Sequence, residues 1–291
     1  MTPAVVEPAP LVAPVVAPLV DCHAHVFDAA MPTCPDAWTV PTYDFTADDL
    51  LAQMDRHEVS HAVLSGLSIA GEYNDYLIRA LRRNPQRLRG TAIVKAPANL
   101  YLLEQMQADG VVGIRLQLAR SEQLPDLDSF DYRLLLRRVR DLDWHVQVAV
   151  EGQRLPQVLD PLLAAGVKVV IDHFGHPDPA DPLNCQGMAA MLRAVDLGAC
   201  WVKLSGGFRL PGTAAWRDDP HGDLDGIAQT VASHLVDRVG PDRLLWGSDA
   251  PFVGYEERLS YDRVLGSFAR WVPDAATRAR IGETALAFYF G

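Results

Sequence analysis

Short apolar runs alternate with longer amphipathic stretches along most of the chain. Near-continuous runs such as Val167–Ile171 are typical of strands that are covered on both faces, as in a parallel sheet. The runs predict strands at 19–26, 61–67, 90–95, 111–118, 144–150, 167–173, 200–205 and 244–249. The stretches between them predict helices near 46–58, 73–84, 99–109, 130–141, 156–165, 185–198, 222–239 and 256–270, with a further one at 274–289. The pattern is a repeated strand–helix unit.

Eight such units can close into a barrel or open into a doubly wound sheet. No G-x-G-x-x-G follows the first predicted strand, where a doubly wound dinucleotide-binding fold would carry it. The length of 291 residues is close to that of an eight-fold barrel. We therefore predict one α/β domain over residues 20–291 with the fold of a (β/α)8 TIM barrel.

The first nineteen residues differ from the rest of the chain. They are apolar, but they have no basic start, and proline recurs at positions 3, 8, 10, 14 and 18. This density of proline is unsuited to a signal peptide or a helical membrane anchor. We expect residues 1–19 to form an extended, mobile arm.

Composition narrows the classes of partner and compartment. The formal net charge of −11 argues against nucleic acid and against an anionic membrane surface as partners. The four cysteines, at 22, 34, 185 and 200, form no C-x-x-C pair, so neither a zinc knuckle nor a disulfide framework is indicated. A reducing, cytoplasmic setting is expected. No pattern in the sequence selects an oligomeric state.

Histidines and an aspartate follow three of the predicted strands. Asp21-Cys22-His23-Ala24-His25 ends the first, and alternation along a strand puts His23 and His25 on one side, roughly 6.6 Å apart. His173 ends the sixth strand, with His176 just beyond it, and Asp249 ends the eighth. In a closed barrel the eighth strand lies beside the first, so we expect His23, His25, His173 and Asp249 to meet at the mouth, where barrel active sites form.

Two kinds of hydrolytic site fit these residues. One is a centre with a single divalent metal ion, most simply zinc, held by His23, His25, His173 and Asp249. The other has no metal, with Asp249 as general base and the histidines stabilising an oxyanion. The plainer interpretations are a hydrogen-bonded core histidine for His173 and a helix N-cap for Asp249.

Arginines near the same strand ends point to an anionic ligand. Arg115 interrupts an apolar strand and needs an anion partner, which is either a substrate carboxylate or a buried Asp or Glu of the protein. Arg120 and Arg209 add positive charge at the mouth of an acidic protein. Weaker candidates for contact with a ligand are Ser65, Ser68, Glu151 and Tyr43.

Five motifs together resemble the amidohydrolase superfamily, in the branch of 2-pyrone-4,6-dicarboxylate lactonase and the sugar-lactone hydrolases. They are Asp-Cys-His-Ala-His at 21–25, Gly-Ile-Arg at 113–115, Ile-Asp-His-Phe-Gly-His-Pro-Asp at 171–178, Val-Lys-Leu-Ser-Gly at 202–206 and Trp-Gly-Ser-Asp-Ala-Pro at 246–251. The resemblance implies a distorted barrel in which Asp249 activates water. It also implies that the three histidines polarise a lactone carbonyl, directly or through a divalent ion.

The resemblance further implies roles for residues around the substrate. Arg115, Arg120 and Arg209 would hold carboxylates and Ser68 would lie near the ligand. We add His176 and Tyr43 as candidate substrate contacts. Two departures limit the comparison. Arg115-Leu116-Gln117 and Val148-Ala149-Val150 replace the residues that binuclear members need, so a binuclear centre is not expected. His176 stands where arginine is usual, and imidazole lacks the bidentate fork of guanidinium.

The expected activity is therefore hydrolysis of a small carboxylated lactone. The alternative is a metal-dependent decarboxylase acting on an aromatic or muconate-type acid, although such enzymes usually carry a histidine on the fifth strand that is missing at Val148–Val150. A barrel kept only as a binding or structural protein is the third reading.

Overall fold

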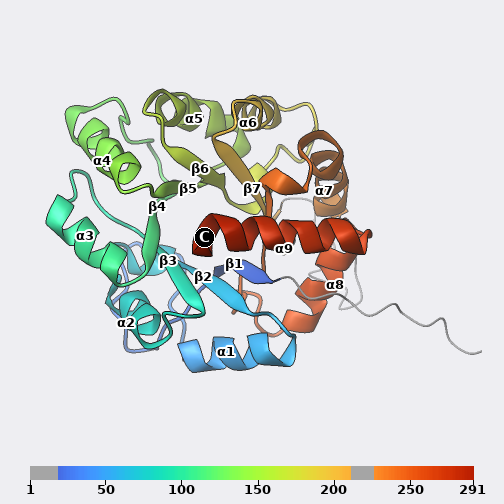
Figure 1. Ribbon diagram of the computed structural model, residues 1–291, viewed down its shortest axis with the longest axis horizontal. Helices are drawn as coiled ribbons and strands as arrows, with labels where there is room; N and C mark the ends of the chain where they lie inside the picture. Colours follow the sequence, from blue (N-terminus) through green and yellow to red (C-terminus); the bar gives the residue numbers. More distant parts are fainter. Residues whose placement is uncertain (1–18, 211–225) are drawn as a thin grey trace, which may run out of the picture.

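Eight parallel strands form one sheet that is arranged as a barrel in the computed structural model, which describes residues 19–210 and 226–291 (Figure 1). Each strand pairs with the next along the chain. The strands are β1 (Val20–Ala24), β2 (His61–Ser65), β3 (Leu88–Ala92), β4 (Val111–Gln117), β5 (His145–Ala149), β6 (Lys168–Ile171), β7 (Cys200–Ser205) and β8 (Leu244–Gly247). The predicted TIM barrel is confirmed.

The barrel is closed by contacts between the last residues of β1 and the segment just after β8. Ala24 and Ala250 form a parallel bridge, and the His25 amide donates to the Ala250 carbonyl at 2.8 Å. The Asp249 amide donates to the His23 carbonyl at 2.7 Å. The first and last strands are thus joined where the predicted site residues lie.

Helices surround the barrel, and most of them follow a strand in turn (Figure 1). They are α1 (Ala47–Arg56), α2 (Asp75–Arg83), α3 (Leu100–Ala108), α4 (Phe130–Asp141), α5 (Leu155–Ala164), α6 (Gln186–Asp196), α7 (Gly226–Val239), α8 (Tyr261–Trp271) and α9 (Ala275–Phe290). Of the helices within 19–210 and 226–291, none is long and apolar enough to cross a membrane.

Several predicted boundaries are wrong, for local reasons. The predicted strand 90–95 lies at 88–92 instead, and the predicted helix 256–270 begins only at Tyr261, where Ser260 caps it by accepting from the Arg263 amide. The predicted arm, apart from residue 19, and the first part of the helix predicted at 222–239 fall outside the described residues.

The floor of the barrel is closed by α9, which crosses the amino-terminal ends of the strands (Figure 1). Ala285 and Tyr289 pack with Val20, Val63 and Leu245 in one buried cluster. The helix therefore covers the amino-terminal end of the barrel, opposite the end where the strands finish.

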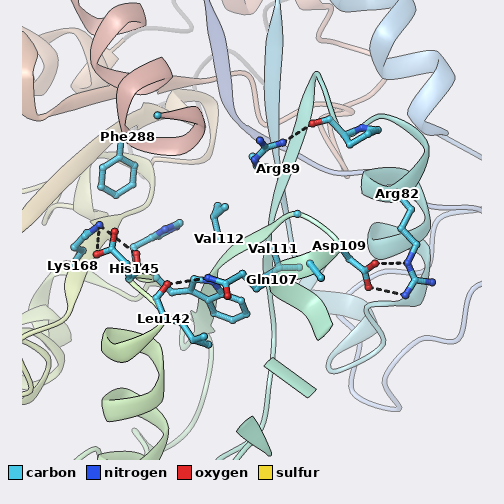
Figure 2. Close-up of a pocket in the computed structure, with 16 residues that line it drawn as sticks. Arg82, Arg89, Gln107, Asp109, Val111, Val112, Leu142, His145, Lys168 and Phe288 are labelled. Carbon is cyan, nitrogen blue, oxygen red and sulfur yellow. Dashed lines mark hydrogen bonds and ion pairs between the residues drawn. The ribbon is translucent and has the colours of Figure 1, made fainter. Parts of the chain in front are cut away.

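A cavity of about 580 Å³ lies beside α9 at the floor (Figure 2). Its charged side chains are matched by their neighbours: Arg82 binds Asp109 through two hydrogen bonds of 2.6 and 2.7 Å, and Lys168 lies 2.8 Å from Asp143. Arg89 donates to the carbonyls of Pro85 and Leu88. Two of its three basic side chains are therefore paired with carboxylates, and the third is hydrogen-bonded to the backbone.

Candidate active site

A cavity of about 680 Å³ opens at the carboxyl ends of the strands. Nine residues singled out in the sequence line it: His25, Ser68, Arg115, Arg120, Glu151, His173, His176, Arg209 and Asp249. His23 lies beneath them and is fully buried. Tyr43 is not among the lining residues; its hydroxyl donates to Glu256 at 2.7 Å.

Two histidine rings of β1 and the segment after it face Asp249. The Nε2 atom of His23 lies 3.7 Å from Asp249 Oδ1, and the Nε2 atom of His25 lies 3.5 Å from the same oxygen. His25 Nδ1 is 2.8 Å from the Ser65 carbonyl oxygen. A carbonyl only accepts, so Nδ1 of His25 carries the ring proton and Nε2 presents an electron pair toward Asp249.

Turns, and not strands, position His173 and Asp249. The predicted strands 167–173 and 244–249 are too long, because β6 ends at Ile171 and β8 at Gly247. His173 and Asp249 have φ values of 50° and 63°, in the left-handed region that non-glycine residues rarely adopt. Such backbone strain is common at functional sites. His173 is held by a contact of 3.0 Å from its Nδ1 to Ser205 Oγ.

Burial and neighbouring charges set the protonation states of Asp249, His23 and His173. Burial alone would raise the pKa of Asp249, but the Arg209 guanidinium, which donates from Nε to Asp249 Oδ2, and the histidines outweigh it and hold that pKa well below its ordinary value. Burial lowers the pKa of His23 well below its ordinary value and also lowers the pKa of His173. At neutral pH the site therefore combines the Asp249 carboxylate with neutral His23 and His173.

The three predicted substrate-binding arginines lie in different environments. Arg115 donates to Asp172 Oδ2 at 3.2 Å and to the Gly66 carbonyl at 2.7 Å, so the buried-carboxylate alternative is what the structure shows for it. Arg209 is paired with Asp249. Arg120 lies over the ring of Trp38 at 4.6 Å and, among the described residues, has no carboxylate partner for its guanidinium. Its side chain is thus the one best placed to pair with a ligand.

Two weaker candidates support their neighbours. Ser65 accepts the His25 hydrogen bond through its carbonyl, and its hydroxyl lies 3.0 Å from Gln147 Nε2. Glu151 accepts from the Arg120 amide at 2.8 Å. Ser65 therefore helps to orient the His25 ring, and Glu151 helps to fix the backbone of Arg120.

Sequence reasoning missed a polar cluster beneath His23. Asp172, Lys203 and Gln147 are fully buried inside the barrel, and Asp172 Oδ1 lies 3.2 Å from His23 Nδ1. Their signal was present in the sequence: Asp172 precedes a site histidine, and Lys203 interrupts the apolar run of β7 in the way that Arg115 interrupts β4.

Two groups of side chains within the described ranges could hold a metal ion. One is His23, His25 and Asp249, and the other is His23, Asp172 and His173. The first fits a divalent cation better, because three electron-pair donors converge there and Nε2 of His23 has no hydrogen-bond partner. In the second group, two cations, Lys203 and Arg115, contact Asp172 on its two oxygens, whereas Asp249 pairs with Arg209 through Oδ2 and leaves Oδ1 facing the histidines. His173 does not join the other three predicted ligands in one group.

Comparisons with known proteins agree with this site. The family model described as Amidohydrolase matches residues 20–291, and the chain belongs to that family. A 4-sulfomuconolactone hydrolase of Rhizobium radiobacter is 29% identical over 266 residues, covering 90% of this chain and 86% of the relative. The 2-pyrone-4,6-dicarboxylate hydrolase of Comamonas testosteroni is 27% identical over 275 residues, covering 92% and 87%.

Solved structures support the same relationship. A probable 2-pyrone-4,6-dicarboxylic acid hydrolase of Acinetobacter baumannii, crystallised with citric acid, is 28% identical and has a TM-score of 0.85, covering 93% of this chain and 98% of its own. A 2,6-dihydroxybenzoate decarboxylase is more distant, at 16% identity and a TM-score of 0.65, and shows likeness of fold alone. The resemblance inferred from the five motifs is thereby confirmed.

Proposed function

We propose that this protein hydrolyses the ring ester of a small lactone that carries a carboxylate. The observation that carries the proposal is the convergence of His23, His25 and Asp249 at the mouth of the barrel, next to Arg209. The relatives named as hydrolases of pyrone and muconolactone acids support it. In this reaction water attacks the lactone carbonyl and the ring carbon–oxygen bond breaks.

Asp249 is the proposed acceptor of the proton from the attacking water. Its carboxylate is ionised and lies at the cavity wall, as a general base requires. The left-handed turn at Asp249 and the amide bond to the His23 carbonyl hold its backbone in place. Water can therefore be deprotonated at a fixed position beside the histidines.

We further propose that His23, His25 and Asp249 hold one divalent cation, zinc being the metal best suited to two imidazoles and a carboxylate. When bound, such an ion supplies Lewis-acid polarisation of the groups that react. Two imidazole nitrogens and a carboxylate oxygen that face one another over 3.5–3.7 Å support this assignment, because these are ligand atoms that zinc binds in proteins.

The carboxylate of the substrate is assigned to the arginine side of the cavity. Arg120 provides a guanidinium without a carboxylate partner among the described residues, and it lies 4.6 Å from the centre of the Trp38 ring. Arg115 is paired with Asp172, and its charge adds positive potential at the cavity that it lines. Ser68 and His176 also line the cavity and are proposed to contact the ligand.

The test is a proton-release screen over pyrone, muconolactone and aldonolactone acids. Ring opening produces a new carboxylic acid, so each turnover of a true substrate releases a proton that an indicator dye detects. Metal content is measured on the same preparation before and after chelation. Failure of every lactone acid with metal-loaded enzyme contradicts the proposal. Activity that survives complete removal of metal contradicts only the cation assignment.

Decarboxylation has no comparable support. The histidine on β5, His145, is the first residue of its strand and lies against Phe288 and Tyr289 of α9, at the floor. At the mouth, β5 ends with Ala149, followed by Val150 and Glu151. Release of carbon dioxide from an aromatic acid, abolished by a chelator, would favour that alternative over the lactonase.

A further inference from the structure

Four charged or polar side chains, from β4, β5, β7 and the residue that follows β6, fill the barrel interior beneath His23. They are Arg115, Gln147, Asp172 and Lys203, and none is more than 5% exposed. Burying charged groups away from water is costly unless every one is paired and hydrogen-bonded. A cluster of this kind next to the candidate active site therefore calls for a functional explanation.

Asp172 is the centre of this cluster and accepts on both oxygens. Its Oδ1 lies 3.2 Å from His23 Nδ1 and 3.3 Å from Lys203 Nζ. Its Oδ2 accepts from Gln147 Nε2 at 2.9 Å and from Arg115 Nη2 at 3.2 Å. Two cations and an amide thus hold the carboxylate in one orientation, with one oxygen facing the His23 ring.

The orientation of Asp172 decides which nitrogen of His23 carries the ring proton. A carboxylate accepts hydrogen bonds and does not donate them, so the proton of neutral His23 lies on Nδ1. The other groups near Nδ1 favour the opposite tautomer. Lys203 Nζ, at 3.4 Å, and Gln147 Nε2, at 3.5 Å, are donors, and without Asp172 they would favour an unprotonated Nδ1.

We propose that Asp172 is a positioning residue that fixes His23 in the Nδ1–H tautomer, so that Nε2 presents an electron pair at the active site. Lys203 contributes to the same positioning, because its ammonium pairs with the Asp172 oxygen that faces the His23 ring. Use of that electron pair in catalysis rests on the proposed function, whereas the tautomer itself does not. Partners that orient a ligating histidine in this way are typically worth about 10–100-fold in metal affinity or activity.

The experiment is nitrogen-15 NMR of the full-length protein with labelled histidine, measured at neutral pH after chelation. Two-bond proton–nitrogen correlations show which ring nitrogen carries the proton, and His23→Gln assigns the signals by removing them. The wild type is expected to show His23 protonated on Nδ1. Asp172→Asn is expected to shift the proton toward Nε2, because Lys203 and Gln147 then supply the nearest donors. An unchanged tautomer in Asp172→Asn overturns the proposal.

Matched variants separate positioning from folding. Asp143→Asn removes a carboxylate that pairs with Lys168 at the floor, away from His23, and is expected to leave the His23 signals unchanged. If Asp172→Asn does not fold, Asp172→Asn/Lys203→Met keeps the charge balance of the cluster, and a proton shifted toward Nε2 is again expected because Gln147 still places a donor beside Nδ1. Lys203→Met alone leaves the carboxylate beside Nδ1, so a proton moved to Nε2 in that variant contradicts the assignment to Asp172.

Kinetics and metal binding provide the functional readout. Asp172→Asn is expected to lower kcat and metal affinity by about 10–100-fold with little change in KM, because it does not line the cavity. Unchanged kcat and unchanged metal affinity in a variant with the shifted tautomer would contradict a positioning role. Should the wild type open no lactone, the proposed function fails while the NMR result still decides the tautomer.

Discussion

Asp249 is the residue on which most contacts of the site converge. It faces His23 and His25 and is paired with Arg209. Asp249→Asn keeps the size of the side chain and removes its charge and basicity. We expect kcat for the best lactone substrate to fall by about 10²–10⁴-fold, the usual contribution of a general base. Steady-state proton release measures the effect, and thermal unfolding of the variant shows that the fold is retained. A kcat that stays within the same order of magnitude would exclude Asp249 as the base.

Arg120 is the residue predicted to determine preference for a charged substrate. Arg120→Met keeps much of the length of the side chain, and its packing on Trp38, but removes the guanidinium. A hydrogen bond to a charged group is worth about 1.5–3 kcal/mol, so kcat/KM for a lactone acid should fall by about 10–100-fold. An uncharged lactone of the same ring should lose far less.

Arg137→Met is the matched control for Arg120. Arg137 lies exposed on α4 and pairs with Asp141 at 3.6 Å, on the outside of the barrel. This variant should hydrolyse lactone acids as the wild type does. Equal losses for charged and uncharged lactones in Arg120→Met would show that the side chain shapes the cavity and does not bind the carboxylate.

The limits of prediction are clear for single residues. Alternation along a strand correctly placed His23 and His25 in the same site and Arg115 inside the barrel. It could not find the partner of Arg115, because Asp172 is 57 positions away and the two meet only when β4 and β6 are placed on either side of β5 in the closed sheet. Strand parity predicts which face a residue occupies, whereas its partner across the barrel depends on how the strands close.

At the scale of elements, Asp21 joins the seam between β1 and β8 to α8. Its Oδ1 accepts from the Ser248 amide at 2.8 Å, and its Oδ2 accepts from the Tyr261 hydroxyl at 2.8 Å. Asp21→Asn replaces an accepting oxygen by a donor that faces these donors. We expect the free energy of unfolding to fall by about 1–3 kcal/mol, the cost of leaving buried polar groups unpaired.

Urea unfolding of Asp21→Asn measures this loss. Asp55→Asn is the control, because Asp55 forms an exposed pair with Arg87 at 2.7 Å, and such pairs contribute about 0–1 kcal/mol. If both variants lose the same free energy, the carboxylate of Asp21 does not stabilise the seam.

Strand ends were the elements that the sequence described least well. Apolar periodicity located all eight strands, but it extended β6 and β8 over His173 and Asp249. Both residues turn the chain through left-handed conformations that are usually signalled by glycine, and neither is glycine. In contrast, the Ser260 cap that begins α8 follows the ordinary sequence signal for a helix start and could have corrected the predicted boundary.

For the molecule as a whole, α9 shows that a periodic pattern predicts a helix but not where the helix packs. The helix predicted at 274–289 is present as Ala275–Phe290. Its place across the floor was not predicted, because the residues it covers, such as Val63 and Leu245, are distributed over several strands. The position of α9 makes His145 a buried histidine at the floor, between Phe288 and Tyr289.

Burial of His145 predicts how stability depends on pH. Burial, followed by the positive charge of Lys203, lowers its pKa to about 3; Lys168 acts in the same direction and Asp172 in the opposite one. In the unfolded chain a histidine has a pKa of about 6.5. Below that value His145 binds a proton in the unfolded chain but not in the folded protein. The folded state therefore loses stability as pH falls. The contribution is fully present above about pH 6.5 and declines by about 1.4 kcal/mol per pH unit until about pH 3.

The measurement compares urea unfolding of wild type and His145→Gln at about pH 7.5 and about pH 5.5, with chelator present so that metal binding does not couple to folding. Glutamine does not titrate, so the decrease in unfolding free energy between the two pH values should be about 1.4 kcal/mol smaller in the variant. A lower overall stability of His145→Gln does not affect this difference, because each protein is compared with itself. Equal decreases in the two proteins would show that His145 accepts its proton as readily in the folded barrel as in the unfolded chain, which would contradict its burial beneath α9.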